Sequence, residues 1–344
     1  MLSKSKLGQF YTTNWEYIFT GMYIPPGVSH IIEPFCGKGN ILQFLNGTND
    51  YTLELYDIDP QYEGTLMRDT LEQPPNYDNK FILTNPPYLA RNKNPDKALY
   101  DIYKTNDLYK CFILTLINSS CEGGIIIVPL NFICSVRKAD VLLRKKFLMA
   151  FDIVLLNIFE ESVFDDTSYA VCSIQFQPKG DPVVNMKTTI FPSRDTIHIQ
   201  LTKENNYTFG GDIHMLPIDK TIKIERATRA TKENTDITNI LLKCIDDNIT
   251  HQLGLQLVDD EKRFIDNTAN LSARSYATLV INKPLTRKEQ ENLVERFNSF
   301  ILAQRAAHHS LFLTNYRESN SIARKRISFS LAFRICNYLL QFPQ

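Results

Sequence analysis

The sequence predicts an α/β fold, with a doubly wound, mostly parallel sheet in the first half of the chain and a second domain after it. Short β-rich runs alternate with helical stretches between residues 30 and 177, and several runs are nearly continuous in Ile, Val and Leu. This alternation ends where Gln177-Pro-Lys-Gly-Asp-Pro opens a polar, loop-rich region. We therefore predict two domains, residues 1–180 and residues 181–344.

Six runs in the first domain are expected to be strands. These runs are His30–Ile32, Thr52–Tyr56, Phe81–Thr84, Ile125–Val128, Ile153–Asn157 and Ala170–Phe176. Apolar residues recur at helical spacing in two of the segments between them, Gly39–Leu45 and Asp107–Ser120. Ligands of such sheets bind beyond the carboxyl ends of the strands, at the point where the strand order reverses. Because acidic, Gly- and Pro-containing segments follow these strand ends, we expect a ligand site there.

The second domain is expected to be α+β or helical, because two helical patterns occupy its end. Thr286 and Glu289 form a capping-box pattern before the first of these helices. Its apolar stripe consists of Leu293, Phe297, Phe300 and Ile301. A second helix is predicted over Ser321–Gln341. Its inward-facing residues are expected to be Ile327, Leu331, Ile335 and Tyr338.

The composition is that of an ordinary globular protein, with 43% hydrophobic and 22% charged residues among 344. The seven cysteines are scattered and never spaced as CxxC, which favours free thiols in a reducing compartment over a zinc site or a disulfide framework. The six histidines show neither HxxH nor HExxH spacing, so we expect no metal. The chain lacks both an apolar signal region at its start and a run of the ~20 apolar residues that a membrane-spanning helix needs. We therefore expect a cytoplasmic protein.

Charge is divided unevenly between the two predicted domains. Residues 1–180 hold 16 Lys and Arg against 20 Asp and Glu, and residues 181–344 hold 22 against 18. A surface that faces a polyanion is therefore expected in the second domain. Its segment 315–329 combines polar amides with four basic residues, which suit phosphates and base edges in the major groove. These are Arg317, Arg324, Lys325 and Arg326. A solvated helix face is the alternative for this segment.

The tetrapeptide Asn85-Pro86-Pro87-Tyr88 follows the strand predicted at Phe81–Thr84. Its two prolines fix two φ angles, remove two N–H donors and keep Asn85 out of the helical region. The resulting stiff turn presents the Asn85 side-chain oxygen and the Pro86 carbonyl as acceptors for the two protons of a planar –NH2 group. Accepting both protons favours a pyramidal nitrogen with an available lone pair. Tyr88 adds a ring face on which a base can stack, whereas an ordinary strand-terminating turn is the alternative.

Two further strand ends carry the features of a nucleotide-like ligand site. Glu33-Pro34-Phe35-Cys36-Gly37-Lys38-Gly39 follows the first strand, and its glycines allow the backbone to approach a ligand closely. Glu33 is placed to pair with a cationic group. Asp57 ends the next strand about twenty residues beyond the glycines, the spacing at which an acid binds ribose hydroxyls. Ile58 is expected to pack on an adenine ring, although a lone GxG is often only a turn.

Taken in this order, the motifs resemble those of the DNA adenine-N6 methyltransferases of restriction–modification systems, in particular the gamma group, in which target recognition comes last. The resemblance covers residues 6–177 and rests on the complete NPPY at Asn85–Tyr88 and on the glycine motif that precedes it. It implies a Rossmann-like domain with a seven-stranded sheet and a C-terminal target-recognition domain. It also implies S-adenosylmethionine as cofactor and double-stranded DNA as partner, with a cognate restriction endonuclease as a separate optional partner.

The same resemblance assigns residues that the pattern alone does not. Phe35 and Gly37 belong to the cofactor motif, and Asp69 accepts a hydrogen bond from the adenine amino group of the cofactor. In the N-terminal motif, Thr12 contacts the methionine carboxylate and Phe10 lies near the target base. In the loop 162–171, Phe164 stacks on a flipped-out adenine, with Tyr169 as second choice, and burial in the core is the alternative for either ring.

Two other functions use the same residues. The NPPY tetrapeptide also occurs in enzymes that methylate RNA bases or the glutamine of release factors, because it recognises an amino group and not a polymer. A non-catalytic nucleic-acid-binding module is the third hypothesis, which the intact set of motifs disfavours. Transfer from a sulfonium donor needs no metal, and an enzyme that reads one strand needs no two-fold symmetry, so we expect a metal-free monomer.

Overall fold

The computed structural model describes residues 12–47, 51–164, 170–180, 186–231, 236–246, 252–266, 275–313, 315–319 and 322–342, with no side chains between 315 and 324. The chain divides into two compact units. Unit 1 comprises Met1–Ile133, Arg137–Thr202 and Glu318–Ala323, and unit 2 comprises Cys134–Val136, Lys203–Arg317 and Arg324–Gln344. The main division thus follows Thr202, beyond the predicted boundary. Among the described helices, none is long and apolar enough to cross a membrane.

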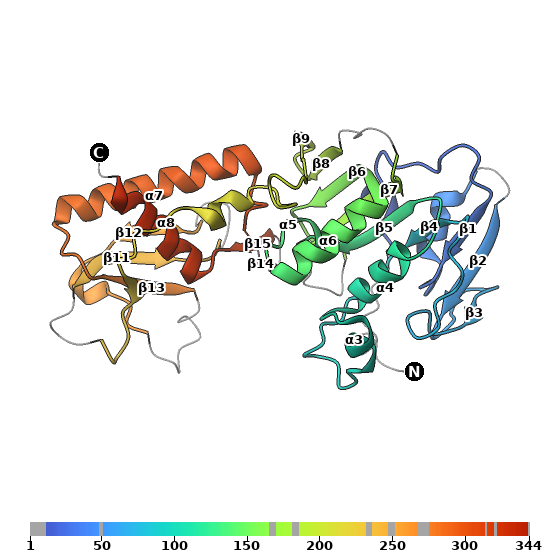
Figure 1. Cartoon of the computed structure of the whole chain (residues 1–344), viewed down its shortest axis with the longest axis horizontal. Coiled ribbons are helices and arrows are strands. Elements are labelled where there is room, and N and C mark those ends of the chain that lie inside the picture. Colours follow the sequence, from blue (N-terminus) through green and yellow to red (C-terminus); the bar gives the residue numbers. More distant parts are fainter. Residues whose placement is uncertain are drawn as a thin grey trace. The chain divides into compact units, whose positions relative to one another are not determined.

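Unit 1 is built on one large sheet with the strand order β3-β2-β1-β4-β5-β7-β6-β8-β9 (Figure 1). The strands are β1 His30–Glu33, β2 Thr52–Asp57, β3 Leu66–Met67, β4 Phe81–Thr84, β5 Gly124–Pro129, β6 Phe151–Phe159, β7 Val171–Pro178, β8 Lys187–Phe191 and β9 Asp195–His198. Neighbouring strands in the series β3-β2-β1-β4-β5 pair in parallel, whereas β7 runs antiparallel to both of its neighbours, β5 and β6. The predicted α/β fold with a mostly parallel sheet is confirmed.

The described sheet has nine strands rather than seven, because β8 and β9 lie beyond the predicted domain boundary. Strand β8 pairs in parallel with β6, and β9 pairs antiparallel with β8. The central strands β4 and β5 are buried along their whole length, as expected for strands covered on both faces. The strand order reverses between β1 and β4, since β2 and β3 extend the sheet in one direction and β5 extends it in the other.

Short helices accompany this sheet. They are α2 Trp15–Ile18, η1 Asn40–Leu45, α3 Ala98–Tyr103, α4 Leu108–Ile117, α5 Asn131–Cys134 and α6 Lys138–Ala150, and α4 packs beside α6 (Figure 1). The helix predicted over Gly39–Leu45 is a 3-10 helix, and the one predicted over Asp107–Ser120 is the shorter α4. Because η1 is short, the chain returns from β1 to β2 quickly and leaves the carboxyl ends of both strands accessible.

Unit 2 contains a four-stranded antiparallel sheet, in the order β10-β13-β11-β12, which the sequence did not predict. Its elements are β10 Ile224–Arg226, β11 Ile237–Lys243, β12 Gly254–Leu257, β13 Tyr276–Ile281, η2 Gly211–Met215, η3 Asp260–Lys262, α7 Arg287–His308 and α8 Phe329–Gln341. The predicted capping box at the start of α7 is confirmed: Glu289 N donates to Thr286 Oγ1, and Thr286 N donates to Glu289 Oε2.

The helix predicted over Ser321–Gln341 is wrong in its first part. A hairpin of β14, Asn315–Ser319, and β15, Ile322–Arg326, occupies that stretch, and α8 begins after the cap residue Ser328. The predicted inward residues Ile327, Leu331 and Ile335 are buried. Tyr338 of α8 and Phe300 of α7 are only half-buried, because they contact one another at the margin of the helix pair.

Candidate active site

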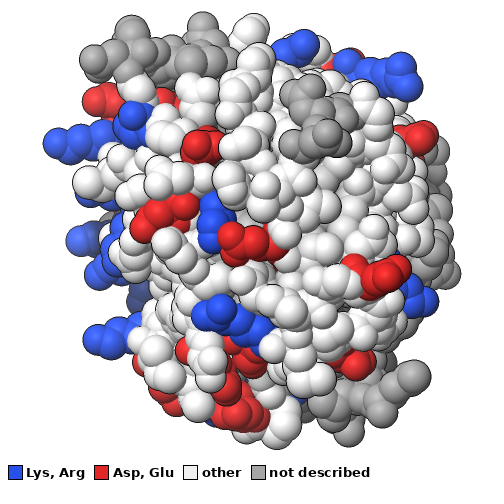
Figure 2. Space-filling view, turned by 90° about the vertical axis from the view of Figure 1, so that its right-hand side faces the viewer, with Lys and Arg blue, Asp and Glu red and all other residues white. Residues whose placement is uncertain are grey.

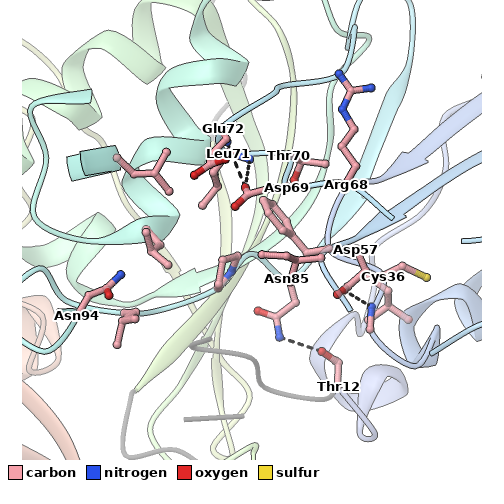
Figure 3. A pocket seen from close by; sticks show the side chains of 18 of the residues that line it. Thr12, Cys36, Asp57, Arg68, Asp69, Thr70, Leu71, Glu72, Asn85 and Asn94 are labelled. Carbon is pink, nitrogen blue, oxygen red and sulfur yellow. Dashed lines mark hydrogen bonds between the residues drawn. The ribbon is translucent and has the colours of Figure 1, made fainter. Parts of the chain in front are cut away.

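Unit 1 holds a cavity of about 410 Å³ at the carboxyl ends of β1, β2, β3 and β4 (Figure 3). This is the point where the strand order reverses, as predicted. Residues predicted from the sequence that line the cavity are Thr12, Phe35, Gly37, Asp57, Ile58, Asp69, Asn85 and Pro87. The structure thus gathers five sequence segments, with Thr12 and Asn85 73 residues apart, around one space large enough for a cofactor-sized ligand.

The turn after β1 is held by a fully buried carboxyl group. Oε1 of Glu33 accepts a hydrogen bond from Phe35 N at 2.9 Å and another from the Thr84 hydroxyl, whereas the buried Oε2 has no hydrogen-bond partner within the described part of the chain. Burial raises the pKa of Glu33 from 4.5 to about 8. Because Glu33 is not among the residues that line the cavity, its first role is to join the end of β1 to the end of β4. Its pairing with a cationic ligand stays a prediction.

The glycines of this turn have the conformation for which the motif was predicted. Gly37 and Gly39 have φ of 51° and 69°, a region that side chains rarely adopt. A Cβ at Gly39 would also lie 2.3 Å from Cδ2 of Tyr62. The backbone N–H of Gly37 donates to Asp57 Oδ2 at 2.7 Å, so the turn after β1 is fastened directly to the end of β2.

Two acids follow neighbouring strands at the cavity wall. Asp57 accepts a second hydrogen bond, from Asp59 N at 2.8 Å, and burial raises its pKa. Oδ1 of Asp69 accepts from Leu71 N at 2.9 Å and from Glu72 N at 3.1 Å, which closes the turn after β3 (Figure 3). Both carboxylates are therefore positioned by backbone donors before any ligand arrives. Ile58, which is 44% exposed, offers an apolar surface beside them.

The carboxamide of Asn85 faces the same cavity from the end of β4. Its Nδ2 donates to Thr12 Oγ1 at 3.1 Å (Figure 3). Its Oδ1 accepts from the Tyr88 hydroxyl. The Tyr88 hydroxyl also lies 2.8 Å from the carbonyl oxygen of Ile127 on β5. Pro87 lines the cavity beside Asn85, and Pro86 is buried beneath it. The double-proline corner thus directs a polar amide into the space that the two acids line.

Two aromatic residues that were predicted to stack on a base are buried in the structure. Tyr88 is 2% exposed and packs edge-on against Tyr109 at 6.1 Å, so its ring is not an open stacking surface as predicted. Phe164 is 5% exposed and likewise buried, where the sequence suggested an exposed ring. Phe10 and Tyr169 lie outside the described residues. A role for these rings toward a base therefore stays a prediction.

The basic segment predicted to contact DNA does not form the helix expected there. The backbone of this segment forms the β14–β15 hairpin, and the side chains of Arg317 and Arg324 lie outside the described ones. Lys325 and Arg326 are half-buried on β15. Contact of these four residues with DNA stays a prediction.

Sequence reasoning missed the residues that line the cavity between β4 and α4. Asn94 and Asp96 come from the segment that leads into α3, and Leu99 lies in the first turn of that helix. Their only signal was position, within fifteen residues of NPPY, because no motif marks them. Arg68 was also missed; it lines the cavity with its guanidinium 5.3 Å from the centre of the Tyr56 ring and bonded to the carbonyls of Gln73 and Pro74.

The side chains that line the cavity suit an organic cofactor better than a metal ion. Among the described residues, no group of three or more His, Cys, Asp or Glu side chains could hold a metal ion. The cavity instead combines two carboxylates at strand ends, a glycine turn and the apolar side chains of Phe35, Ile58 and Leu99. Such a mixture fits a ligand with hydroxyl groups and an aromatic base.

Comparison with known proteins found similar folds only. No family model matches the chain, and a search of curated proteins finds no match. A structure from a type I restriction–modification system has a TM-score of 0.43 and 16% identity, covering 54% of this chain and 45% of that one. A type I restriction–modification methyltransferase subunit from Streptococcus thermophilus has a TM-score of 0.38 and 15% identity, covering 56% and 51%. The DrdV–DNA complex has a TM-score of 0.41 and 15% identity, covering 70% and 35%. The chain thus spans about half or less of these proteins.

Proposed function

We propose that this chain is an S-adenosylmethionine-dependent methyltransferase that methylates N6 of a flipped-out adenine in double-stranded DNA. One observation carries the proposal: the Asn85 carboxamide, on a double-proline corner, faces the same cavity as Asp57 at the end of β2 and Asp69 in the turn after β3. Methylation of an amino group needs two sites side by side. One is an amide that accepts hydrogen bonds from the amino group, and the other binds a nucleoside-like cofactor.

The residues of the cavity fit the parts of the cofactor in order. Asp57 would accept hydrogen bonds from the ribose hydroxyls, and Ile58 would pack on the adenine ring, whose amino group would reach Asp69. Gly37 allows close approach of the backbone to the amino-acid portion, near Glu33 and Thr12. When bound, S-adenosylmethionine supplies a methyl group on a positively charged sulfur.

The chain's own contribution to transfer is positioning. Oδ1 of Asn85 and the Pro86 carbonyl would accept the two protons of the target amino group, so that the nitrogen lone pair points at the methyl carbon. Holding nucleophile and donor in line makes the displacement effectively unimolecular, which accounts for much of the rate of such reactions. An adenine reaches this cavity only outside the helix stack, at a cost of a few kcal/mol. Phe10 and Phe164 are the candidates to stack on it.

Contact with DNA is proposed for the basic residues Arg317, Arg324, Lys325 and Arg326. Figure 2 shows one face of the molecule, on which many Lys and Arg side chains lie along the left margin with Asp and Glu among and beside them. The proposal for these four residues rests on the composition of their segment, because positive side chains suit the phosphate backbone, and binding through them should weaken steeply with salt. The protein is proposed to act as a monomer, with any cognate restriction endonuclease acting separately.

Methyl transfer is tested by incubating the protein with cofactor labelled in the methyl group and duplex DNA, RNA or release factor, then identifying the product after digestion. We expect N6-methyladenine from DNA. Labelled RNA or methylglutamine would transfer the assignment to the other NPPY enzymes, and no product from any substrate would contradict an enzymatic role.

Asn85→Ala should lower the rate on DNA by at least about 100-fold, the effect typical of removing a preorganised polar contact to a reacting group. Asn118→Ala is the matched control, because Asn118 is an exposed asparagine at the end of α4, outside the cavity lining. Cofactor affinity should be similar in both variants. A wild-type rate of DNA methylation in Asn85→Ala would contradict the proposed function.

A further inference from the structure

Unit 2 holds a second cavity, of about 590 Å³, at the side of its sheet where α8 packs beside β10. Its lining comes from β10, the turn that follows it, β13 and α8. The residues that matter here are Arg226, Thr228, Thr231, Val280, Phe329 and Phe333. None of the residues described in this lining also lines the cavity of unit 1, so the second cavity is a separate surface for which the proposed reaction has no use so far.

Two aromatic rings form one wall of this cavity. Phe329 and Phe333 lie one helical turn apart on α8, with ring planes 17° apart and ring centres 6.1 Å apart. Residues with this spacing share one face of a helix. Both rings are half-buried and line the cavity. They therefore present one continuous aromatic surface to whatever binds there.

A cation is held beside these rings. The guanidinium of Arg226 lies 5.5 Å from the centre of the Phe329 ring. Its Nη1 is 3.0 Å from Oδ2 of Asp266, whose side chain is only 4% exposed. Because this ion pair fixes a long side chain before any ligand arrives, less conformational entropy is lost on binding. Flat guanidinium groups and aromatic rings are the surfaces on which unstacked bases bind.

The chain beside the cavity is mostly basic. Residues 219–231 and 325–326, counted together with Asp266, contain six Lys and Arg against three Asp and Glu. The side chains of Lys220, Lys223 and Arg229 are exposed. An excess of positive charge beside an aromatic wall is complementary to a polyanion that carries flat aromatic groups, which is the chemistry of a nucleic-acid strand.

From these observations, and resting on the proposed function for the choice of DNA, we propose that the cavity between β10 and α8 binds an unpaired base of a DNA strand. The base would stack on Phe329 and Phe333, and its flanking phosphates would meet Lys223 and Arg229. The base has to be unpaired, because a base inside the helix presents only its edges in the grooves. This site is additional to the cavity of unit 1, which is proposed to take the target adenine.

Stacking is tested with two labelled duplexes that differ at one position, where one carries an unpaired thymine and the other an abasic nucleotide. Fluorescence anisotropy without S-adenosylmethionine measures the affinity for each. The wild type should bind the unpaired thymine at least about fivefold more tightly, the effect typical of one stacked base. Equal affinities for the two duplexes would overturn the proposal.

Phe333→Leu keeps an apolar side chain on α8 but removes the ring, so it should abolish the preference for thymine and leave the affinity for the abasic duplex unchanged. Phe333→Tyr keeps the ring and should retain the preference. Phe300→Leu is the matched control, because Phe300 is a half-buried phenylalanine on α7 of unit 2, outside the cavity lining. A preference for thymine that persists in Phe333→Leu would overturn the assignment of the base to α8.

Asn85→Ala distinguishes the two cavities. An unpaired base bound in unit 1 would lose affinity in this variant, which would overturn the proposal, whereas a base bound in unit 2 should keep its affinity. The phosphate contacts are tested with Lys223→Ala and Arg229→Ala. Both variants should weaken binding of the two duplexes to the same extent and make the affinity less dependent on salt. Unchanged affinity and salt dependence in both variants would contradict these contacts.

These binding measurements involve no methyl transfer, so they are independent of the proposed function. A protein that prefers the unpaired thymine but methylates no DNA would refute the proposed function and leave the second site standing. A protein that methylates adenine in DNA but binds the two duplexes equally would refute the second site alone.

Discussion

Replacing the buried Glu33 with glutamine should remove a pH dependence from the stability of unit 1. Burial raises the pKa of Glu33 from 4.5 to about 8, so the folded protein binds a proton that the unfolded chain has already lost. Between these two values the folded state holds more protons, and stability falls as pH rises. The stabilising effect of the neutral carboxyl is complete below the unfolded pKa and disappears as pH passes through the folded one.

The size of this effect follows from the two pKa values. Within the window each pH unit changes the free energy of unfolding by about 1.4 kcal/mol. Because the curve flattens close to the folded pKa, raising the pH from 6 to 8 should cost the wild type roughly 2 kcal/mol through Glu33. Glutamine cannot ionise, so Glu33→Gln should lack this loss. Asp107, whose pKa burial raises to about 7, contributes equally to both proteins, and its effect cancels in the difference.

The assay is urea unfolding at pH 6, 7 and 8, followed by tryptophan fluorescence. The chain has a single tryptophan, and Trp15 lies on α2 of unit 1, so the signal reports this unit. The exposed Glu122→Gln controls for the substitution itself. If the difference in unfolding free energy between wild type and Glu33→Gln is the same at pH 6 and pH 8, the argument that Glu33 is protonated in the folded protein is wrong.

Two further substitutions test the site and unit 2 separately. Asp57→Asn should weaken binding of S-adenosylmethionine at least about tenfold, because the NH2 group of the new amide would face the N–H of Gly37 or Asp59 and leave that donor without an acceptor. Titration calorimetry measures the affinity for the cofactor, and a wild-type value would contradict the assignment of Asp57. Thr286→Ala removes the capping box of α7 and should destabilise unit 2 by about 1 kcal/mol. Circular dichroism during unfolding should detect this loss, while the cofactor affinity of unit 1 stays the same, and a fall in that affinity would contradict a purely local effect.

The centre of the sheet could be predicted from sequence because burial on both faces leaves a signature. Strands β1, β2 and β4 lie within a residue or so of the predicted runs, and the polar turn residues after them mark their ends. Asp57 and Asn85 were predicted to lie at the cavity for the same reason: each marks the carboxyl end of a strand that the sequence predicted. In a parallel sheet, neighbouring strand ends meet at one edge, so order along the chain was enough to bring these residues together.

Some strands outside the centre of the large sheet could not be predicted, because they form by pairing with other strands across a sheet. Strand β10 is three residues long and mostly exposed, and it exists because it pairs with β13, more than fifty residues away in sequence. In Ile322–Arg326 the basic residues fit a solvated helix face as well as a strand. Local pattern cannot distinguish these outcomes, since β structure is stabilised by neighbours across the sheet.

The same limit explains why the burial of the Tyr88 ring was not predicted. An aromatic residue after a proline corner is exposed or buried according to what surrounds it, and here Tyr109 and Ile127 come from elements that follow it along the chain. The motif identified the residue, and the fold decided which of its groups, the ring or the hydroxyl, faces the amide.

One buried carboxyl links the two halves of the proposed reaction. Glu33, the last residue of β1, opens the predicted cofactor motif, and its Oε1 also accepts from Thr84, the last residue of β4 and the immediate neighbour of Asn85. A change that displaces Glu33 therefore acts both on the turn proposed to approach the cofactor and on the strand end that carries the Asn85 amide. Because Gly37 is in turn fastened to Asp57, the ends of β1, β2 and β4 form one connected support. The free-energy changes caused by substitutions at Glu33 and Asn85 should therefore not add up in the double variant, as expected for residues that share a hydrogen-bond network.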